Sequence, residues 1–265
     1  MIDPDRFDEM RARLQQRVKP SRYLHSLGVS QTAEQLARIY GVSCEDAAVA
    51  GLLHDWDKAR PFDELRRLAK KHKLAPKRVR KQMPSVLHAL TAPYSLRREF
   101  PDLSDDVLRA IARHTCGAID MSDLDKVVFI ADIIEPGRTF SDVAPLREAV
   151  GEVSLDELFF MTYRSTLVYL LEDGLPVCPA SIEAWNDLVK RRKKARRAAQ
   201  RDGVEDVRET ARDDSGASVL ETEEAAAGEG GATPEARGAR GLARELASRI
   251  AAEGAVSRRR SIVIE

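Results

Sequence analysis

Helical periodicity runs through most of this sequence and constrains the fold more than any other feature. Over residues 5–197, apolar residues recur at spacings of three and four positions, as on one face of a helix. No window shows the sustained apolar–polar alternation of a strand. Ser43, Ser104 and Ser154 each precede acidic residues, as the N-cap of a helix commonly does. We therefore predict an all-α domain over residues 1–197.

Glycines mark where several of the expected helices end. The apolar pattern stops at Gly41, Gly117, Gly151 and Gly174, and glycine commonly closes a helix because it takes the left-handed conformation readily. The expected helices cover approximately residues 3–17, 20–40, 43–57, 61–72, 76–82, 84–98, 104–115, 122–134, 142–151, 154–173 and 179–198.

The chemistry of the chain changes after about residue 197. No Phe, Tyr, Trp, His or Cys follows, and Ala, Gly, Glu and Arg dominate. Such a segment cannot bury enough apolar area to offset the entropy of ordering it. We predict a disordered, low-complexity tail over residues 198–265. Leu242, Leu246 and Ile250 allow a short helix near 241–251, although a frayed, solvated segment is the simpler interpretation.

Charge and cysteine content exclude several classes of protein. With 43 basic and 43 acidic residues, no global field attracts nucleic acid or an acidic membrane. The cysteines at 44, 116 and 178 are far apart, which argues against a disulfide framework or a thiolate zinc site and fits a reducing cytoplasm. No window reaches the roughly 20 apolar residues that span a bilayer. We expect a soluble, cytoplasmic protein; nothing here indicates its oligomeric state.

Histidines are few in this chain, and their placement is informative. Of the five, His25, His54, His88 and His114 lie on apolar helical faces, whereas the fifth sits in the charged stretch "AKKHKL". Each one taken singly is more often a satisfied core residue than a ligand. Buried imidazoles are nevertheless costly unless their nitrogens are paired, and a metal ion pairs several at once. Four together, with Asp55 directly after His54, favour a metal site.

A second carboxylate is available to complete such a site. Asp132 is the one charge in the apolar run from Val127 to Ile134, where an unpaired carboxylate would be strongly disfavoured. A salt bridge to a buried arginine is the alternative, but the histidines also need a partner. Divalent transition metals accept imidazole and carboxylate together, so Asp55 could bind one ion or bridge two.

These residues stand in ordered motifs that resemble those of the HD-domain metal-dependent phosphohydrolases. More narrowly, the motifs are similar to those of the bacterial YqeK family of symmetrical dinucleoside tetraphosphatases. The resemblance covers roughly residues 5–195 and implies an HD-domain helical bundle. The motifs are "RYLHSLGV" at 22–29, "AGLLHDWDK" at 50–58, "LHA" at 87–89, "ARHTCG" at 112–117 and "FIADIIEPGR" at 129–138.

The resemblance implies a metal centre with a defined set of ligands. The cofactor would be a divalent transition metal, iron in this family, as one or two ions. Two further imidazoles, His88 and His114, match positions that hold a second ion or contact the substrate phosphates. The ligands of the first ion would be His25, His54, Asp55 and Asp132.

The resemblance also implies the residues that meet the substrate. Basic positions expected to grip the nucleotide are Arg22, Lys58 and Arg138, and the catalytic set would be Asp55, Lys58, His88 and His114. Taken alone, Lys58 could be an ordinary helix-end cation, and Arg138 could pair with Glu135 or Asp142. The segment "LPVCPAS" would border the nucleotide through Leu175, Pro176 and Cys178.

Three positions depart from the family pattern. Cys178 stands where histidine is frequent, and Trp56 and Asp57 stand where the family has isoleucine and alanine. These changes leave the metal ligands intact. The question they raise concerns the contacts on the nucleoside side.

The activity implied is cleavage of diadenosine tetraphosphate, or a related dinucleoside polyphosphate, into two ADP by a metal-activated water. Another HD phosphohydrolase, acting on a different nucleotide or an alarmone, is the nearest alternative. A non-catalytic nucleotide sensor is a different class, but such proteins typically lose ligands that are retained here. RNA binding through the basic stretches at 70–82 and 190–197 lacks the aromatic residues that usually stack on bases.

Overall fold

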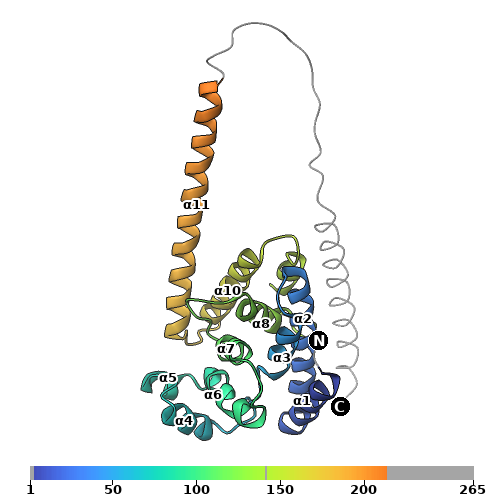
Figure 1. Ribbon diagram of the computed structural model, residues 1–265. Helices are drawn as coiled ribbons and strands as arrows, with labels where there is room; N and C mark the ends of the chain where they lie inside the picture. The colour runs from blue at the N-terminus through green and yellow to red at the C-terminus, as the bar shows by residue number, and fades with distance from the viewer. Residues whose placement is uncertain (1–2, 141, 214–265) are drawn as a thin grey trace.

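The computed structural model describes residues 3–140 and 142–213, which form α-helices with no strand among them (Figure 1). The predicted all-α fold is confirmed. The helices are α1 (Pro4–Arg17), α2 (Pro20–Tyr40), α3 (Cys44–Leu53), α4 (Phe62–Lys71), α5 (Lys77–Gln82), α6 (Pro84–Glu99), α7 (Asp105–Arg113), α8 (Asp123–Ile134), α9 (Val143–Glu148), α10 (Leu155–Glu172) and α11 (Pro179–Asp213).

Helix boundaries follow the capping signals in the sequence. The side chains of Ser43, Ser104 and Ser154 each accept a hydrogen bond from the backbone N–H three residues later, at 3.2 Å in each case. Gly41 closes α2 with a left-handed φ of 72°. Each serine hydrogen bond satisfies a backbone N–H that the start of a helix leaves without an intrahelical partner.

Helix α8 lies at the centre of the helical body and packs against α2, α7 and α10. Its apolar side chains are almost completely inaccessible to solvent, as the uninterrupted run in the sequence predicts. The side chain of Asp132, within this apolar run, is only 14% exposed and faces mainly other protein groups. This placement gives Asp132 its importance.

A second, smaller apolar cluster joins α4, α5 and α6 at one end of the body. It contains Leu65, Val79 and Leu87, together with two cysteines, Cys116 and Cys178. Among the described residues, no helix is both long enough and apolar enough to span a membrane.

Two helices differ from the predicted ranges. The helix expected over 43–57 ends at Leu53, and hydrogen bonds of the 3₁₀ type, including Lys58 N–H to Asp55 C=O at 2.9 Å, continue the chain as tight turns. α11 runs past its predicted end at 198 to Asp213, because residues 198–213 are rich in good helix formers. The predicted tail boundary therefore falls inside a helix. The possible helix near 241–251 lies outside the described residues.

Candidate metal centre

The histidines and aspartates singled out in the sequence come together from five helical segments. Their ligand atoms form three overlapping groups, each within 4.8 Å, and most of the side chains are buried. The set is His25 in α2, His54 and Asp55 directly after α3, His88 in α6, His114 directly after α7, and Asp132 in α8.

One group of ligand atoms surrounds the Oδ2 side of Asp55. His25 Nε2 lies 3.1 Å from Asp132 Oδ1 and 3.2 Å from His54 Nε2. His54 Nε2 in turn lies 3.3 Å from Asp55 Oδ2. Two imidazole nitrogens and two carboxylate oxygens therefore converge on one small volume.

A second group surrounds the other oxygen of the same carboxylate. Asp55 Oδ1 lies 2.9 Å from His88 Nε2 and 3.9 Å from His114 Nε2, and the two imidazole nitrogens are 3.2 Å apart. Asp55 thus presents one oxygen to each group. A carboxylate in this position can bind one ion or bridge two.

The hydrogen bonds of the other ring nitrogens determine what these imidazoles can bind. His54 Nδ1 donates to Gly51 C=O at 2.7 Å, and His114 Nδ1 donates to Ile111 C=O at 2.7 Å, since a carbonyl can only accept. In the neutral ring each Nε2 then carries a lone pair. These nitrogen lone pairs and the carboxylate oxygens converge on the same volume with no proton between them. Such an arrangement suits a divalent cation.

Burial and charge set the protonation of the acids and imidazoles. Burial would raise the pKa of Asp55 and of Asp132, but the surrounding imidazoles, and Arg138 beside Asp132, hold both values well below the usual range. Burial lowers the pKa of His114 to about 3 and also lowers that of His88. The centre therefore combines two ionised carboxylates with neutral rings at His88 and His114, and ionised carboxylates and neutral imidazoles are the forms that bind metal.

Basic residues predicted to meet the nucleotide lie against these carboxylates. Arg22 Nη1 donates to Asp55 Oδ2 at 2.9 Å, and Lys58 Nζ lies 3.9 Å from Asp55 Oδ1. Arg138 donates to Asp132 through Nη2 at 2.5 Å. All three side chains remain about one-third exposed, so they can also face a ligand at the mouth of the centre.

Glu135 belongs to this site, although the sequence indicated it only as a partner of Arg138. Its Oε1 accepts from His25 Nδ1 at 3.0 Å, so it orients that ring, and its Oε2 accepts from Gly137 N–H at 2.6 Å. Gly28 gives it room, because a Cβ there would lie 2.7 Å from Oε2. The signal in the sequence was an acid directly after the buried run of α8.

Trp56 and Asp57, which depart from the family pattern, are buried and serve packing. Asp57 accepts from Arg17 at 2.9 Å, from Arg60 at 2.7 Å and from Ser95 at 2.8 Å. Trp56 lies between the Arg17 guanidinium and the Phe100 ring. Both side chains therefore connect the turn after α3 to α1 and α6.

The segment at 175–181, which was expected to border the nucleotide, contributes no ligand to the metal centre and packs near it only through Cys178. Cys178 is buried beside Cys116, which follows His114 by two residues, and Tyr163 and Ser181 both donate to Cys116 C=O, at 2.6 and 3.0 Å. Leu175 and Pro176 are exposed. Cys178 thus supports the loop that carries His114 rather than joining the ligand cluster.

Comparison with known proteins agrees with this arrangement. Residues 22–137 match the HD domain family, and this range contains every ligand of the centre. The fold and the site therefore define an HD-domain protein with a metal centre. The chain is 33% identical over 182 residues to the symmetrical bis(5'-nucleosyl)-tetraphosphatase of Bacillus subtilis (strain 168), covering 69% of this chain and 97% of that protein. It belongs to the family of symmetrical bis(5'-nucleosyl)-tetraphosphatases.

Two further relatives support this membership. The protein of the same name from Halalkalibacterium halodurans is 34% identical over 187 residues, covering 69% of this chain and 99% of that protein. A crystal structure of a predicted HD superfamily hydrolase involved in NAD metabolism from Clostridium acetobutylicum superposes with a TM-score of 0.65 at 33% identity. That match covers 70% of this chain and 97% of the other.

Proposed function

We propose that this protein hydrolyses dinucleoside tetraphosphates symmetrically, converting diadenosine tetraphosphate into two ADP. The observation that carries the proposal is the position of Asp55, whose two oxygens face two groups of imidazoles beside three partly exposed cations. Multiply charged phosphates need such a combination of metal and cationic side chains. The names of the relatives from B. subtilis and H. halodurans describe the same symmetrical activity.

The ligand atoms support two metal positions that share Asp55. His25, His54, Asp55 and Asp132 would hold the first ion, and His88, His114 and Asp55 the second. When bound, a divalent metal ion lowers the pKa of water towards neutrality and offsets charge on phosphoryl oxygens. We propose iron as the metal, because the imidazole and carboxylate ligands suit a divalent transition metal and because the resemblance of the sequence motifs implies iron.

The chain's own side chains would position the polyphosphate. Lys58, Arg22 and Arg138 are charged, partly exposed and within 4 Å of the ligand carboxylates, so they can contact phosphates next to the ions. Preorganised cations of this kind stabilise charge that develops on the phosphoryl oxygens. ADP is a good leaving group, so no dedicated general acid is required. Leu175, Pro176 and Cys178 remain proposed as the border of the nucleotide site.

We also propose that the protein works in the cytoplasm of a bacterium. Its cysteines are free thiols, which fits a reducing compartment, and the named relatives come from bacteria. A nucleotide substrate would be available there.

Product analysis tests the proposal. The purified, iron-loaded protein is incubated anaerobically with a panel of dinucleoside polyphosphates, nucleoside triphosphates and guanosine alarmones, with the Asp55→Ala variant as control. We expect two ADP from each diadenosine tetraphosphate and little turnover of mononucleotides. Formation of ATP and AMP, or turnover restricted to mononucleotides or alarmones, would contradict it.

A further inference from the structure

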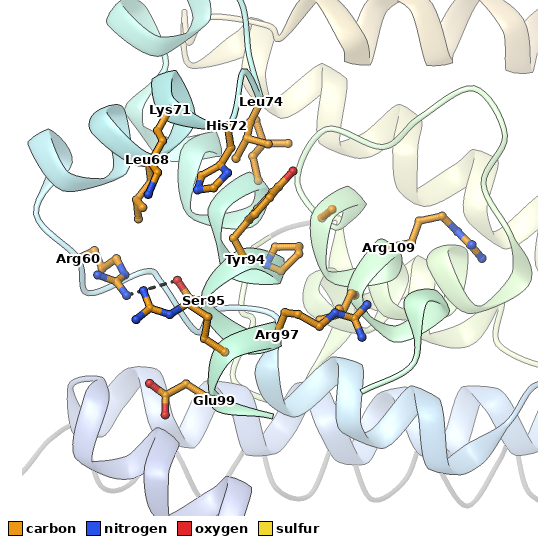
Figure 2. A pocket seen from close by; sticks show the side chains of 15 residues that line it. Arg60, Leu68, Lys71, His72, Leu74, Tyr94, Ser95, Arg97, Glu99 and Arg109 are labelled. Atoms are coloured by element: carbon orange, nitrogen blue, oxygen red, sulfur yellow. Dashed lines mark hydrogen bonds between the residues drawn. The ribbon is translucent and has the colours of Figure 1, made fainter. Parts of the chain in front are cut away.

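A cavity lies away from the metal centre, between α4, α6 and α7 (Figure 2). Its volume is about 1200 Å³, larger than the roughly 300–1,000 Å³ of ordinary ligand pockets. We call it the basic cleft. Its lining combines an apolar floor, including Leu68, Leu90 and Leu108, with an aromatic ring and a rim of cations.

The basic cleft is separate from the metal centre because it uses the opposite sides of the same helices. On α6, Leu90, Tyr94 and Arg98 are four residues apart and share one face, whereas His88 is rotated from Leu90 by about 200°. No residue of the cleft belongs to the ligand groups found in the described part of the chain. A ligand here would not touch the ions.

Positive charge predominates in this cleft although the whole chain is neutral. Its lining holds Arg60, Lys71, Arg97, Arg98 and Arg109 but only one acid, Glu99, which pairs with Arg13 at 3.0 Å.

Ion pairs already engage three of these cations. Arg60 pairs with Asp57, Arg97 with Asp105, and Arg109 with Asp106. Lys71 and Arg98 have no carboxylate partner within the described ranges, and both are exposed. These two charges are available to an anion.

An aromatic platform stands beside the free cations. Tyr94 is 41% exposed, and its ring stacks on His72 with centroids 4.3 Å apart and planes at 29°. Figure 2 shows Tyr94 in the middle of the cleft, with Lys71 and His72 on the α4 side. An exposed ring of this kind accepts a planar base, and the neighbouring cations accept phosphates.

We propose that the basic cleft is a second, non-catalytic binding site for a nucleoside di- or triphosphate. The base stacks on Tyr94, and the phosphates contact Lys71 and Arg98. Because the cleft lacks a cluster of metal ligands in the described chain, it binds the nucleotide without cleaving it. This inference goes beyond the proposed hydrolase activity and does not depend on it.

Calorimetric titration of the full chain with ADP tests the site. The titration is made in the Asp55→Ala background, so that the cleft is measured apart from an intact metal centre. We expect one ADP per chain, and we expect Lys71→Ala with Arg98→Ala to weaken binding at least about tenfold. Lys70→Ala is the matched control, because this lysine neighbours Lys71 on α4 but does not line the cleft, and it should leave the affinity unchanged.

The aromatic contact has its own test. Tyr94→Leu should weaken binding of ADP but not of inorganic pyrophosphate, which has no base to stack. Absence of ADP binding in the Asp55→Ala protein, unchanged affinity in the double variant, or an equal loss in Lys70→Ala would overturn the proposal. So would equal effects of Tyr94→Leu on both ligands, or tenfold tighter binding of an oligoadenylate RNA, which would reassign the cleft to nucleic acid.

Discussion

Two buried aspartates lie two residues apart in the turn after α3, and their surroundings differ completely. Asp57 is held by Arg17, Arg60 and Ser95, which all donate hydrogen bonds. Asp55 faces the Nε2 atoms of His54, His88 and His114, and in the neutral rings of His54 and His114 that atom carries a lone pair. Arg22 is its one close arginine among the described residues. Asp57 is therefore satisfied by the protein alone, whereas Asp55 lies among groups that need a cation. Burial alone does not identify a functional carboxylate, but the chemistry of its neighbours does.

Backbone geometry explains how neighbours in sequence reach such different regions. Side chains two residues apart in a helical turn point to nearly opposite sides. Tight turns hold this arrangement, with Lys58 N–H to Asp55 C=O at 2.9 Å and Arg60 N–H to Asp57 C=O at 3.0 Å. One side of the turn faces α2, α6, α7 and α8 at the metal centre, and the other faces α1 and α6.

The largest effect is expected from Asp55→Ala. Turnover should fall to background and most bound metal should be lost, because this carboxylate belongs to two of the three ligand groups. The helical fold should survive, which circular dichroism would check. Wild-type metal content together with a wild-type rate would show that the site is assigned incorrectly.

Asp57→Ala should lower the stability of the fold and leave metal binding unchanged, which is the opposite of the result expected for Asp55→Ala. Removing this acid leaves Arg17 and Arg60 without their shared partner, so the free energy of unfolding should fall by about 1–3 kcal/mol. Both arginines are partly exposed and water can reach them, which keeps the loss below that of a fully buried pair. Urea unfolding gives the stability, and metal per folded chain should be unchanged. A loss of metal here would break the contrast with Asp55.

Single substitutions compare the ligands of the first proposed ion with those of the second. His25→Ala or Asp132→Ala should strip the first ion and lower the rate together.

His88→Ala should lower metal content by about half, and excess metal should partly restore the rate by mass action. If His88→Ala and His114→Ala both match wild type in metal content and kinetics, these two are ordinary core histidines.

Acidification should weaken metal binding in a predictable window. Burial lowers the pKa of His25, but its hydrogen bonds to Asp132 and Glu135 outweigh this and raise the pKa above the ordinary 6.5. Protonation of the metal-free ring competes with the ion, so affinity should be constant above that pKa and fall by about tenfold per pH unit below it. Competition with a chelator between pH 8 and 5 measures this. A decline that began only well below 6.5 would contradict the raised pKa.

The smallest effect is expected from shortening the chain. A protein that ends at Gln200 keeps every ligand of the centre and the packed N-terminal part of α11, so activity and thermal stability should match the full chain. Side-by-side melting curves and rates measure this. A large loss would mean that residues beyond 200 contribute to the enzyme.

Much of the fold was predictable because helical periodicity and caps are local signals. The expected segments match the observed helices closely over residues 3–172 except in the turn after α3. That turn was missed because His54, Asp55 and Trp56 continue the helical pattern, while long-range contacts to other helices bend the chain.

The metal ligands were predictable because polar residues in apolar runs need partners. Glu135 was missed because its role depends on the ring orientation of His25, 110 residues away. The basic cleft was missed for a similar reason: Tyr94 lies in α6, far in sequence from the stretch at 70–82 that it approaches. Contacts of this kind do not appear in a local pattern.

Metal content of three proteins prepared anaerobically in parallel tests the central claim most directly. Wild type, Asp55→Ala and Asp57→Ala are loaded with iron, desalted and analysed for metal per folded chain. We expect about two ions in wild type and in Asp57→Ala, and little or none in Asp55→Ala. Equal metal in all three, or greater loss in Asp57→Ala than in Asp55→Ala, would contradict it.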